Sequence, residues 1–209
     1  MYDKIYCINL DQRPERYEGF QRDVFDVLGF DKSKFERISA IDTRSLGITN
    51  PGAVGCILSH IKAWDDMLAN GYDSVLILED DFIPTVDTVK FNEIIKELYD
   101  LHPNFSTAYI SWSNERGSVL LKKSENWSFM NNIALTSGYI ITRKHIQLVY
   151  DTISRCAVNL MLGGKLNDNA IDMALMRFQS YDNMASNVLL GVQSSYGSDI
   201  QITSYDPNF

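Results

Sequence analysis

The clearest candidate for chemistry is a run of three carboxylates, Glu79, Asp80 and Asp81, directly after the apolar stretch 74–78. Like charges at the end of a buried strand repel one another unless a cation or protons intervene. Carboxylate oxygens are the hard ligands that Mg²⁺ and Mn²⁺ prefer. In an extended chain Glu79 and Asp81 point to the same side. We therefore predict that these two bind a divalent cation that could hold a diphosphate; a solvated strand end or a helix N-cap cluster is the alternative.

Two arginines near the N-terminus are candidates for binding phosphate. Arg13 and Arg16 flank a predicted helix start at Pro14, which a first helical turn tolerates. Guanidinium groups and free helix amides both bind phosphates. The alternative is that both arginines lie on the surface and pair with Glu15 or Asp11.

Small and polar residues mark a third segment, 52–60, which opens a helix. Its glycines would let the backbone approach a ligand closely. Ser59 and His60 fall off the apolar arc of that helix, and Asp42 follows a predicted strand. Each has a structural alternative, because a helix-edge histidine is often a satisfied core residue and Asp42 could be a cap.

Alternating strand and helix patterns must position these residues. Up to residue 101 the alternation predicts an α/β fold with a doubly wound, mostly parallel sheet, in which ligands bind beyond the carboxyl ends of the strands. No repeat, linker or change of composition divides the chain, so one domain over 1–209 is expected. The expected strands are 4–10, 35–41, 74–78, 107–112, 118–121 and 138–142, and the expected helices lie within 14–28, 54–68, 91–101, 146–153 and 171–178.

Composition excludes several classes of protein. The 209 residues include 19 Lys and Arg against 27 Asp and Glu, a net charge of −8. This acidity argues against binding nucleic acid or an anionic membrane. No apolar run approaches the ~20 residues of a membrane span, and the first residues lack a signal-peptide pattern. Three scattered cysteines without a CxxC motif argue against a zinc site or disulfide framework and predict a reducing, cytoplasmic setting.

Taken together, the motifs resemble those of glycosyltransferase family 25, which contains lipopolysaccharide β-galactosyltransferases and procollagen galactosyltransferases. The similar segments are INLDQRPER (8–16), SAID (39–42), GAVGCILSHIKAW (52–64), VLILEDDF (75–82) and SGYIITRKH (137–145), with weaker similarity in AIDMAL (170–175) and QSSYGSDI (193–200). The resemblance implies a GT-A-type, Rossmann-like sheet flanked by helices, a UDP-sugar donor, Mn²⁺ (or Mg²⁺) and inversion at the anomeric carbon. It also implies a glycan or glycoprotein acceptor.

The resemblance also implies roles for individual residues. Glu79, Asp80 and Asp81 take the place of the family's metal-binding motif. The family usually places a glycine after the residue matching Asp42, and here Thr43 stands there. Many GT-A enzymes supply a metal-ligating histidine late in the chain, but no histidine follows His145 here. Gln193, Ser198, Asp199 or water would therefore complete the metal site. The residues implied to bind the donor are Asn9, Arg13, Arg16, Asp42, Ser59, His60 and Asp80.

Transfer to a hydroxyl requires a base, and two carboxylates in the segment 166–172 are candidates. We favour Asp172 and then Asp168, although either could cap a helix, and Asp168 stands where an N-cap is expected. An aromatic group could stack on sugar rings or belong to the core. Its members are Tyr109, Trp112, Trp127 and Tyr139.

Other functions predict different residues. A sugar nucleotidyltransferase needs a glycine-rich phosphate loop after the first strand, where this chain has INLDQRPER. An aspartyl-phosphate phosphatase needs an Asp-x-Asp nucleophile there, and only Asp11 of the pair Asn9 and Asp11 is an aspartate. A glycosyltransferase-like domain that binds sugar nucleotide or glycan without turnover is the non-enzymatic alternative.

Overall fold

The computed structural model describes residues 1–113, 119–180 and 182–194. Within them, one sheet has the strand order β2-β1-β3-β8-β5-β9-β7-β6, and a small second sheet pairs β4 with β10. The strands of the large sheet are β1 (Lys4–Asn9), β2 (Phe35–Ser39), β3 (Ser74–Glu79), β5 (Thr107–Tyr109), β6 (Val119–Lys122), β7 (Trp127–Asn131), β8 (Gly138–Thr142) and β9 (Asn183–Ser186). Those of the small sheet are β4 (Phe82–Pro84) and β10 (Gly191–Gln193).

The α/β fold is confirmed, but the large sheet is mixed rather than mostly parallel. β1 runs parallel to both β2 and β3, as the alternation of strands and helices up to residue 101 predicts. β8 then enters between β3 and β5 and runs antiparallel to both. Among the described residues that connect β5 to β8, none forms an α-helix, and such connections permit antiparallel pairing.

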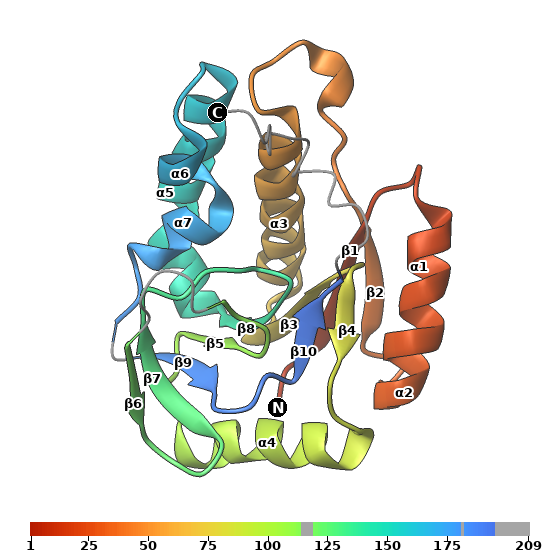
Figure 1. Cartoon of the computed structure of the whole chain (residues 1–209), viewed down its shortest axis with the longest axis vertical. Coiled ribbons are helices and arrows are strands. Elements are labelled where there is room, and N and C mark those ends of the chain that lie inside the picture. The colour runs from red at the N-terminus through yellow and green to blue at the C-terminus, as the bar shows by residue number, and fades with distance from the viewer. Residues whose placement is uncertain (114–118, 181, 195–209) are drawn as a thin grey trace, which may run out of the picture.

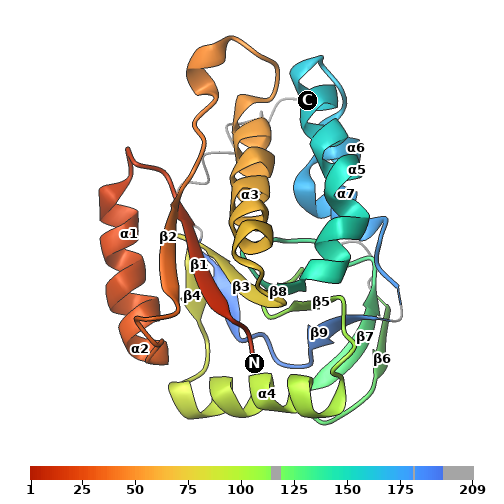
Figure 2. The same cartoon turned by 180° about the vertical axis from the view of Figure 1, so that it is seen from behind.

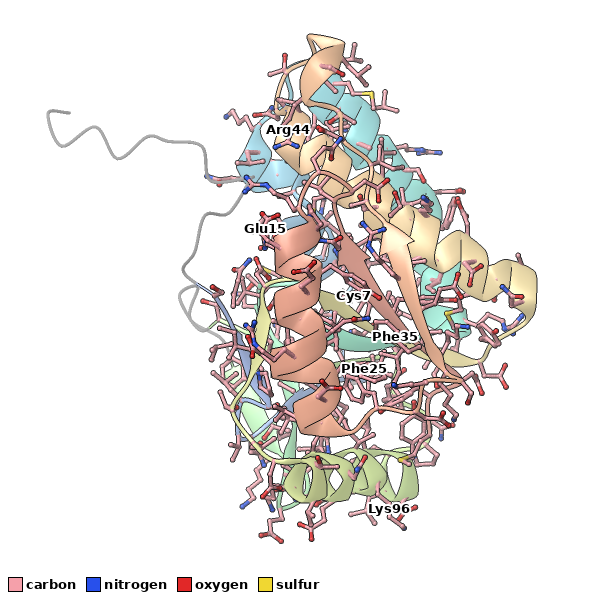
Figure 3. The ribbon with its side chains drawn as sticks, turned by 90° about the vertical axis from the view of Figure 1, so that its right-hand side faces the viewer. Cys7, Glu15, Phe25, Phe35, Arg44 and Lys96 are labelled. Carbon is pink, nitrogen blue, oxygen red and sulfur yellow. The ribbon has the colours of Figure 1, made fainter. Side chains whose placement is uncertain are left out.

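Helices cover both faces of the sheet. Figures 1 and 2 show α3 and α5 side by side on one face, and α4 on the opposite side. Figure 3 shows the N-terminal helical segment in front of the sheet, with Phe25 and Phe35 labelled beside its lower half; their rings are in edge-to-face contact. The helices are α1 (Pro14–Phe20), a π-helical turn η1 (Gln21–Phe25), α2 (Asp26–Leu28), a 3₁₀ turn η2 (Arg44–Leu46), α3 (Pro51–Asn70), α4 (Thr88–Leu101), α5 (Arg143–Met161), α6 (Leu166–Asn169) and α7 (Ile171–Met176).

The sheet separates two apolar clusters. Successive side chains of β3 enter the two clusters in turn. Val75 and Ile77 pack toward α3 and α5, whereas Leu76 and Leu78 pack toward α4 and the N-terminal helices. All four are fully buried, as expected for a strand covered on both faces.

The aromatic group predicted as either core or sugar platform belongs mainly to the core. Tyr109, Trp127 and Tyr139 are buried, and Trp112 is partly buried with its indole N–H donated to the Ser186 carbonyl. None of the helices in the described ranges is long and apolar enough to cross a membrane.

Two close approaches bring the site together. A Cβ at Gly55 would lie 2.5 Å from the Ile41 carbonyl oxygen, so only glycine lets α3 pack this tightly against the segment after β2. The Phe82 ring lies against Gly138 and Gly191, where a Cβ would come within 2.7 Å and 2.1 Å of it. This packing brings β10, and with it Gln193, beside the carboxyl end of β3.

Candidate active site

A pocket with an empty volume of about 700 Å³ opens at the carboxyl ends of β1 and β3, beside the N-terminal half of α3. This is the edge of the sheet at which a ligand is expected. Of the residues predicted from the sequence, it brings together Asn9, Arg16, Asp42, Ser59, His60, Glu79, Asp80 and Asp81.

Arg16 neutralises part of the acidic run. Its Nη2 lies 2.6 Å from Asp80 Oδ1 and 3.1 Å from Asp81 Oδ2. Asn9 fixes the same cluster from β1, because its amide donates to Asp80 Oδ2 at 2.7 Å while its Oδ1 accepts from Arg37 Nη2, also at 2.7 Å. The pocket therefore has a fixed guanidinium beside two carboxylates.

Asp81 is the most constrained of the carboxylates. The residue is 8% exposed, and its Oδ2 accepts a hydrogen bond from Gln193 Nε2 at 3.1 Å. Its buried Oδ1 has no hydrogen-bond partner in the described part of the chain. Burial, followed by the nearby charge of Glu79, raises the pKa of Asp81 to about 7. A cation at this oxygen would satisfy it.

The pKa of Glu79 is shifted in the opposite direction to that of Asp81. Burial raises the pKa of Glu79, but hydrogen bonds from His60 and Thr136, together with electrostatic attraction to His60 and Arg16, outweigh burial and leave this pKa below its ordinary value. Both bonds go to Oε1, at 3.3 Å from His60 Nε2 and 2.9 Å from Thr136 Oγ1. Glu79 and Asp81 are therefore the residues that could hold a divalent cation together.

His60 lies at the base of the pocket and is fully buried. Its Nδ1 is 2.8 Å from the Tyr139 hydroxyl, which also accepts from Trp64 Nε1 at 3.3 Å. The imidazole therefore connects the core of the protein to Glu79.

Two other predicted donor residues make bonds within the protein. Ser59 Oγ donates to the Gly55 carbonyl at 2.6 Å and accepts from the Ile41 amide at 2.8 Å, so it fastens α3 to the pocket wall. Asp42 accepts from Arg44 Nε at 2.8 Å and from the Arg44 amide at 3.0 Å. These bonds lower the pKa of Asp42 to about 2, and the bond from the Arg44 side chain has the larger effect. Asp42 is thus an anion at the pocket rim, paired with Arg44.

A second pocket, with an empty volume of about 590 Å³, shares Cys56, Glu79 and Gln193 with the first. Asp172 lines this second pocket and does not line the first. Leu135, also in its lining, has a φ of 90°, which is strained for a branched side chain. The two pockets meet at Glu79, so ligands in both could come into contact.

The structure does not bring Arg13 and Asp168 to these pockets. The Arg13 guanidinium lies 3.7 Å from Glu15 and is 39% exposed, in agreement with the surface-pair alternative. Asp168 is exposed on α6 and lines a separate cavity with Arg177. The N-cap position of α7 is Ala170, so Asp168 does not start that helix.

Sequence reasoning missed several residues of the site. Thr136 and Arg37 carry no local pattern that marks them, because each reaches the site through tertiary packing. Cys56 was noted only as one of three cysteines. Gln193 was one of three proposed replacements for a late histidine; the other two, Ser198 and Asp199, lie outside the described residues.

Comparison with known proteins gives consistent results. Residues 47–161, more than half of the chain, match the model of glycosyltransferase family 25 (LPS biosynthesis protein). A glycosyltransferase 25 family member of Drosophila melanogaster is 37% identical over 98 residues, covering 38% of this chain and 16% of its own length. Procollagen galactosyltransferase 2 of Homo sapiens is 24% identical over 53% of this chain and 20% of its own.

One similar relative is named as inactive. Inactive glycosyltransferase 25 family member 3 of Homo sapiens is 26% identical over 38% of this chain and 16% of its own length. Against these curated relatives, the alignments span a fifth of the relative's length or less.

Among solved structures, a glycosyltransferase involved in the glycosylation of the major capsid of PBCV-1 superposes with a TM-score of 0.55. The alignment covers 93% of each chain at 9% identity, so it supports the GT-A-type fold alone. The family match is independent of this likeness and spans α3, β3 and the acidic run that follows. On that match, the chain belongs to glycosyltransferase family 25.

Proposed function

We propose that this chain is a metal-dependent glycosyltransferase domain that transfers a hexose from a UDP-sugar to a hydroxyl group of a glycan or glycoprotein, with inversion. The observation that carries the proposal is the unpartnered, buried Oδ1 of Asp81 beside the anionic Glu79, at the carboxyl end of a central strand. Family membership supplies the reaction class.

The carboxylates fit Mn²⁺ or Mg²⁺, which prefer hard oxygen ligands. Glu79 and Asp81 would hold the ion, which would stabilise the charge that develops on the departing UDP. Gln193 keeps the Asp81 carboxylate in place through its hydrogen bond to Oδ2. Arg16, between Asp80 and Asp81, provides a second positive charge close to where the phosphates would lie.

The second pocket is suited to the acceptor. Asp172 lines it, and Glu79 stands at the boundary with the first pocket. In the reaction, the acceptor oxygen bonds to the anomeric carbon while the bond from that carbon to the phosphate oxygen breaks. Asp172 would take the proton from the acceptor hydroxyl as this bond forms.

The experiment for the nucleotide site is a calorimetric titration of UDP in the presence of Mn²⁺ and again in EDTA. Binding that requires Mn²⁺ supports a metal-bridged nucleotide and would be followed by turnover assays with UDP-galactose and UDP-glucose. Binding of equal strength in EDTA would remove Glu79 and Asp81 from the mechanism. Absence of UDP binding in both conditions would contradict the proposed donor.

The assignment of the base is tested by comparing Asp172→Asn with Asp168→Asn. We expect Asp172→Asn to lower kcat by about 10²–10⁴-fold, the usual contribution of a general base, with UDP affinity retained. Asp168→Asn should have little effect because Asp168 lines a different cavity. A larger loss of kcat in Asp168→Asn than in Asp172→Asn would contradict the assignment.

A domain that binds sugar nucleotide without turnover is the second candidate, since similar relatives are named inactive. The complete Glu79-Asp80-Asp81 run favours activity over this alternative. Hydrolysis of the donor in the absence of acceptor would distinguish the two, because a domain that only binds leaves the UDP-sugar intact.

A further inference from the structure

Beside the carboxylate pair lies a second group of metal-ligating side chains with different chemistry. Cys56 and His60 are four residues apart on α3, so they share one face of the helix. Glu79 reaches them from the end of β3. One ligand atom from each of the three side chains lies within 4.8 Å of the other two.

The distance between His60 and Glu79 fits two ligands of one ion. Their Nε2 and Oε1 atoms are 3.3 Å apart, which is long for an N–H···O hydrogen bond. Two ligands each about 2.1 Å from a tetrahedral Zn²⁺ lie about 3.4 Å apart. The Cys56 sulfur lies within 4.8 Å of both atoms, and closure of the site around an ion would bring it to the ~2.3 Å of a Zn–S bond.

The surroundings also match those of a metal-binding histidine. Such a histidine usually hydrogen-bonds through its second ring nitrogen to a neighbouring group that orients it. His60 does so through Nδ1, 2.8 Å from the Tyr139 hydroxyl, and Tyr139 is held in turn by Trp64. Cys56 lines both pockets and is partly exposed, which gives an ion a route of entry.

From this arrangement we infer that Cys56, His60 and Glu79 form a site for a thiophilic divalent cation, for which Zn²⁺ is the natural probe, with water as the fourth ligand. The Cys56 S–H proton leaves to solvent as the Zn–S bond forms, and no oxidation takes place. Cysteine spacing could not indicate this site, because two of its three ligands are not cysteines.

The site shares Glu79 with the proposed Mn²⁺ site, so the two ions compete. Only this competition rests on the proposed function; binding of Zn²⁺ by the three residues does not. With Zn²⁺ bound here, Glu79 would no longer be available to bind Mn²⁺ together with Asp81. Zn²⁺ should therefore inhibit donor binding.

The test uses Co²⁺ as a spectroscopic substitute for Zn²⁺, added to the reduced, metal-free protein. We expect the near-ultraviolet charge-transfer band of a Co²⁺–thiolate bond, its disappearance on adding Zn²⁺, and its absence in Cys56→Ser. Cys156→Ser is the matched control and should keep the band, because Cys156 is buried on α5, away from these residues. A band that never forms, or that persists in Cys56→Ser, would overturn the inference.

Affinity provides a second readout. Loss of a direct ligand in Cys56→Ser or His60→Gln should weaken Zn²⁺ binding by at least about a hundredfold, the upper end of what an outer partner contributes. Thermal melting verifies that each variant is folded, and Zn²⁺ binding of unchanged strength in both folded variants would refute the site.

Competition is measured from the EPR signal of free Mn²⁺. One equivalent of Zn²⁺ should weaken Mn²⁺ binding in the wild type and not in Cys56→Ser. A Co²⁺–thiolate band without any binding of Mn²⁺ or UDP would support the Cys56–His60–Glu79 site and reject the proposed function. Binding of Mn²⁺ and UDP without that band would support the proposed function and reject the site.

Discussion

Asp81→Asn should stabilise the metal-free protein while it abolishes turnover. The folded protein holds the Asp81 carboxylate in a buried position, repelled by Glu79 and with Oδ1 lacking a partner. Asparagine has the same shape and can still accept hydrogen bonds from Gln193 and Arg16 through its amide oxygen. The substitution therefore removes a buried charge but keeps a hydrogen-bond acceptor for Gln193 and Arg16.

The size of the effect follows from the pKa of Asp81. A rise from 3.8 to about 7 corresponds to about 4 kcal/mol, at about 1.4 kcal/mol per pH unit. Because the folded state binds the Asp81 proton more tightly, the contribution of Asp81 to stability is fully present below about pH 4 and is lost as the pH rises to about 7. Since Glu79 shares part of this repulsion, we expect Asp81→Asn to gain about 2–4 kcal/mol at pH 8 and almost nothing at pH 4.

The assay is thermal and urea unfolding of both proteins between pH 4 and pH 8, in EDTA and without nucleotide. A gain of 2–4 kcal/mol corresponds to a rise in Tm of about 4–16 °C for a chain of this size. Asp151→Asn, at an exposed position on α5, is the control for loss of a carboxylate in general. Mn²⁺ should then stabilise the wild type and not the variant.

Two results would refute this reasoning. If Asp81→Asn destabilised the protein equally at every pH, the ion pair of Asp81 with Arg16 would outweigh burial and the repulsion from Glu79, contrary to this reasoning. If the variant kept more than about a tenth of the wild-type turnover, Asp81 would not be a metal ligand of the reaction.

Other consequences of the packing around the site can be tested by stability and binding measurements. Gly55→Ala places a methyl group 2.5 Å from the Ile41 carbonyl oxygen; urea unfolding should show a loss of about 1–3 kcal/mol, and calorimetry weaker UDP binding. Gly19→Ala, where the nearest atom is 3.9 Å away, should cost nothing, and equal losses in the two variants would contradict this account. Tyr139→Phe removes the hydroxyl between His60 and an indole N–H, so chemical unfolding should show a loss of about 1–3 kcal/mol; an unchanged midpoint would mean that these buried groups find other partners.

The sequence by itself determined the parts of this protein that local patterns encode. The apolar stretch 74–78 indicates a strand buried on both faces, and the adjacent carboxylates must then lie at its end. The spacing of apolar residues locates most of the helices within a few residues of their observed bounds, although α5 runs eight residues beyond the predicted end and α6 was not predicted. The order of the motifs indicates the family. These features depend on residues close together in the chain, whose geometry the backbone fixes.

The tertiary structure decided which of the candidates meet. Arg16 and Arg13 are equivalent in the sequence pattern, yet Arg16 lines the first pocket and pairs with Asp80, whereas Arg13 lies beside Glu15 and is partly exposed. In the same way, Asp172 lines a pocket that contains Glu79 and Asp168 lines another cavity. The direction of β8 was not predictable either, because a strand's composition does not depend on whether its neighbours are parallel or antiparallel.

The partners of Glu79 show the physical reason. His60 and Thr136 stand 19 and 57 residues away in the chain, on opposite sides of β3 in sequence, and both donate to the same carboxylate oxygen. Such contacts arise when the core closes and distant segments are brought within hydrogen-bond distance. The sequence specifies the chemical groups, and the packing of α3, β3 and β8 determines which of them act on one another.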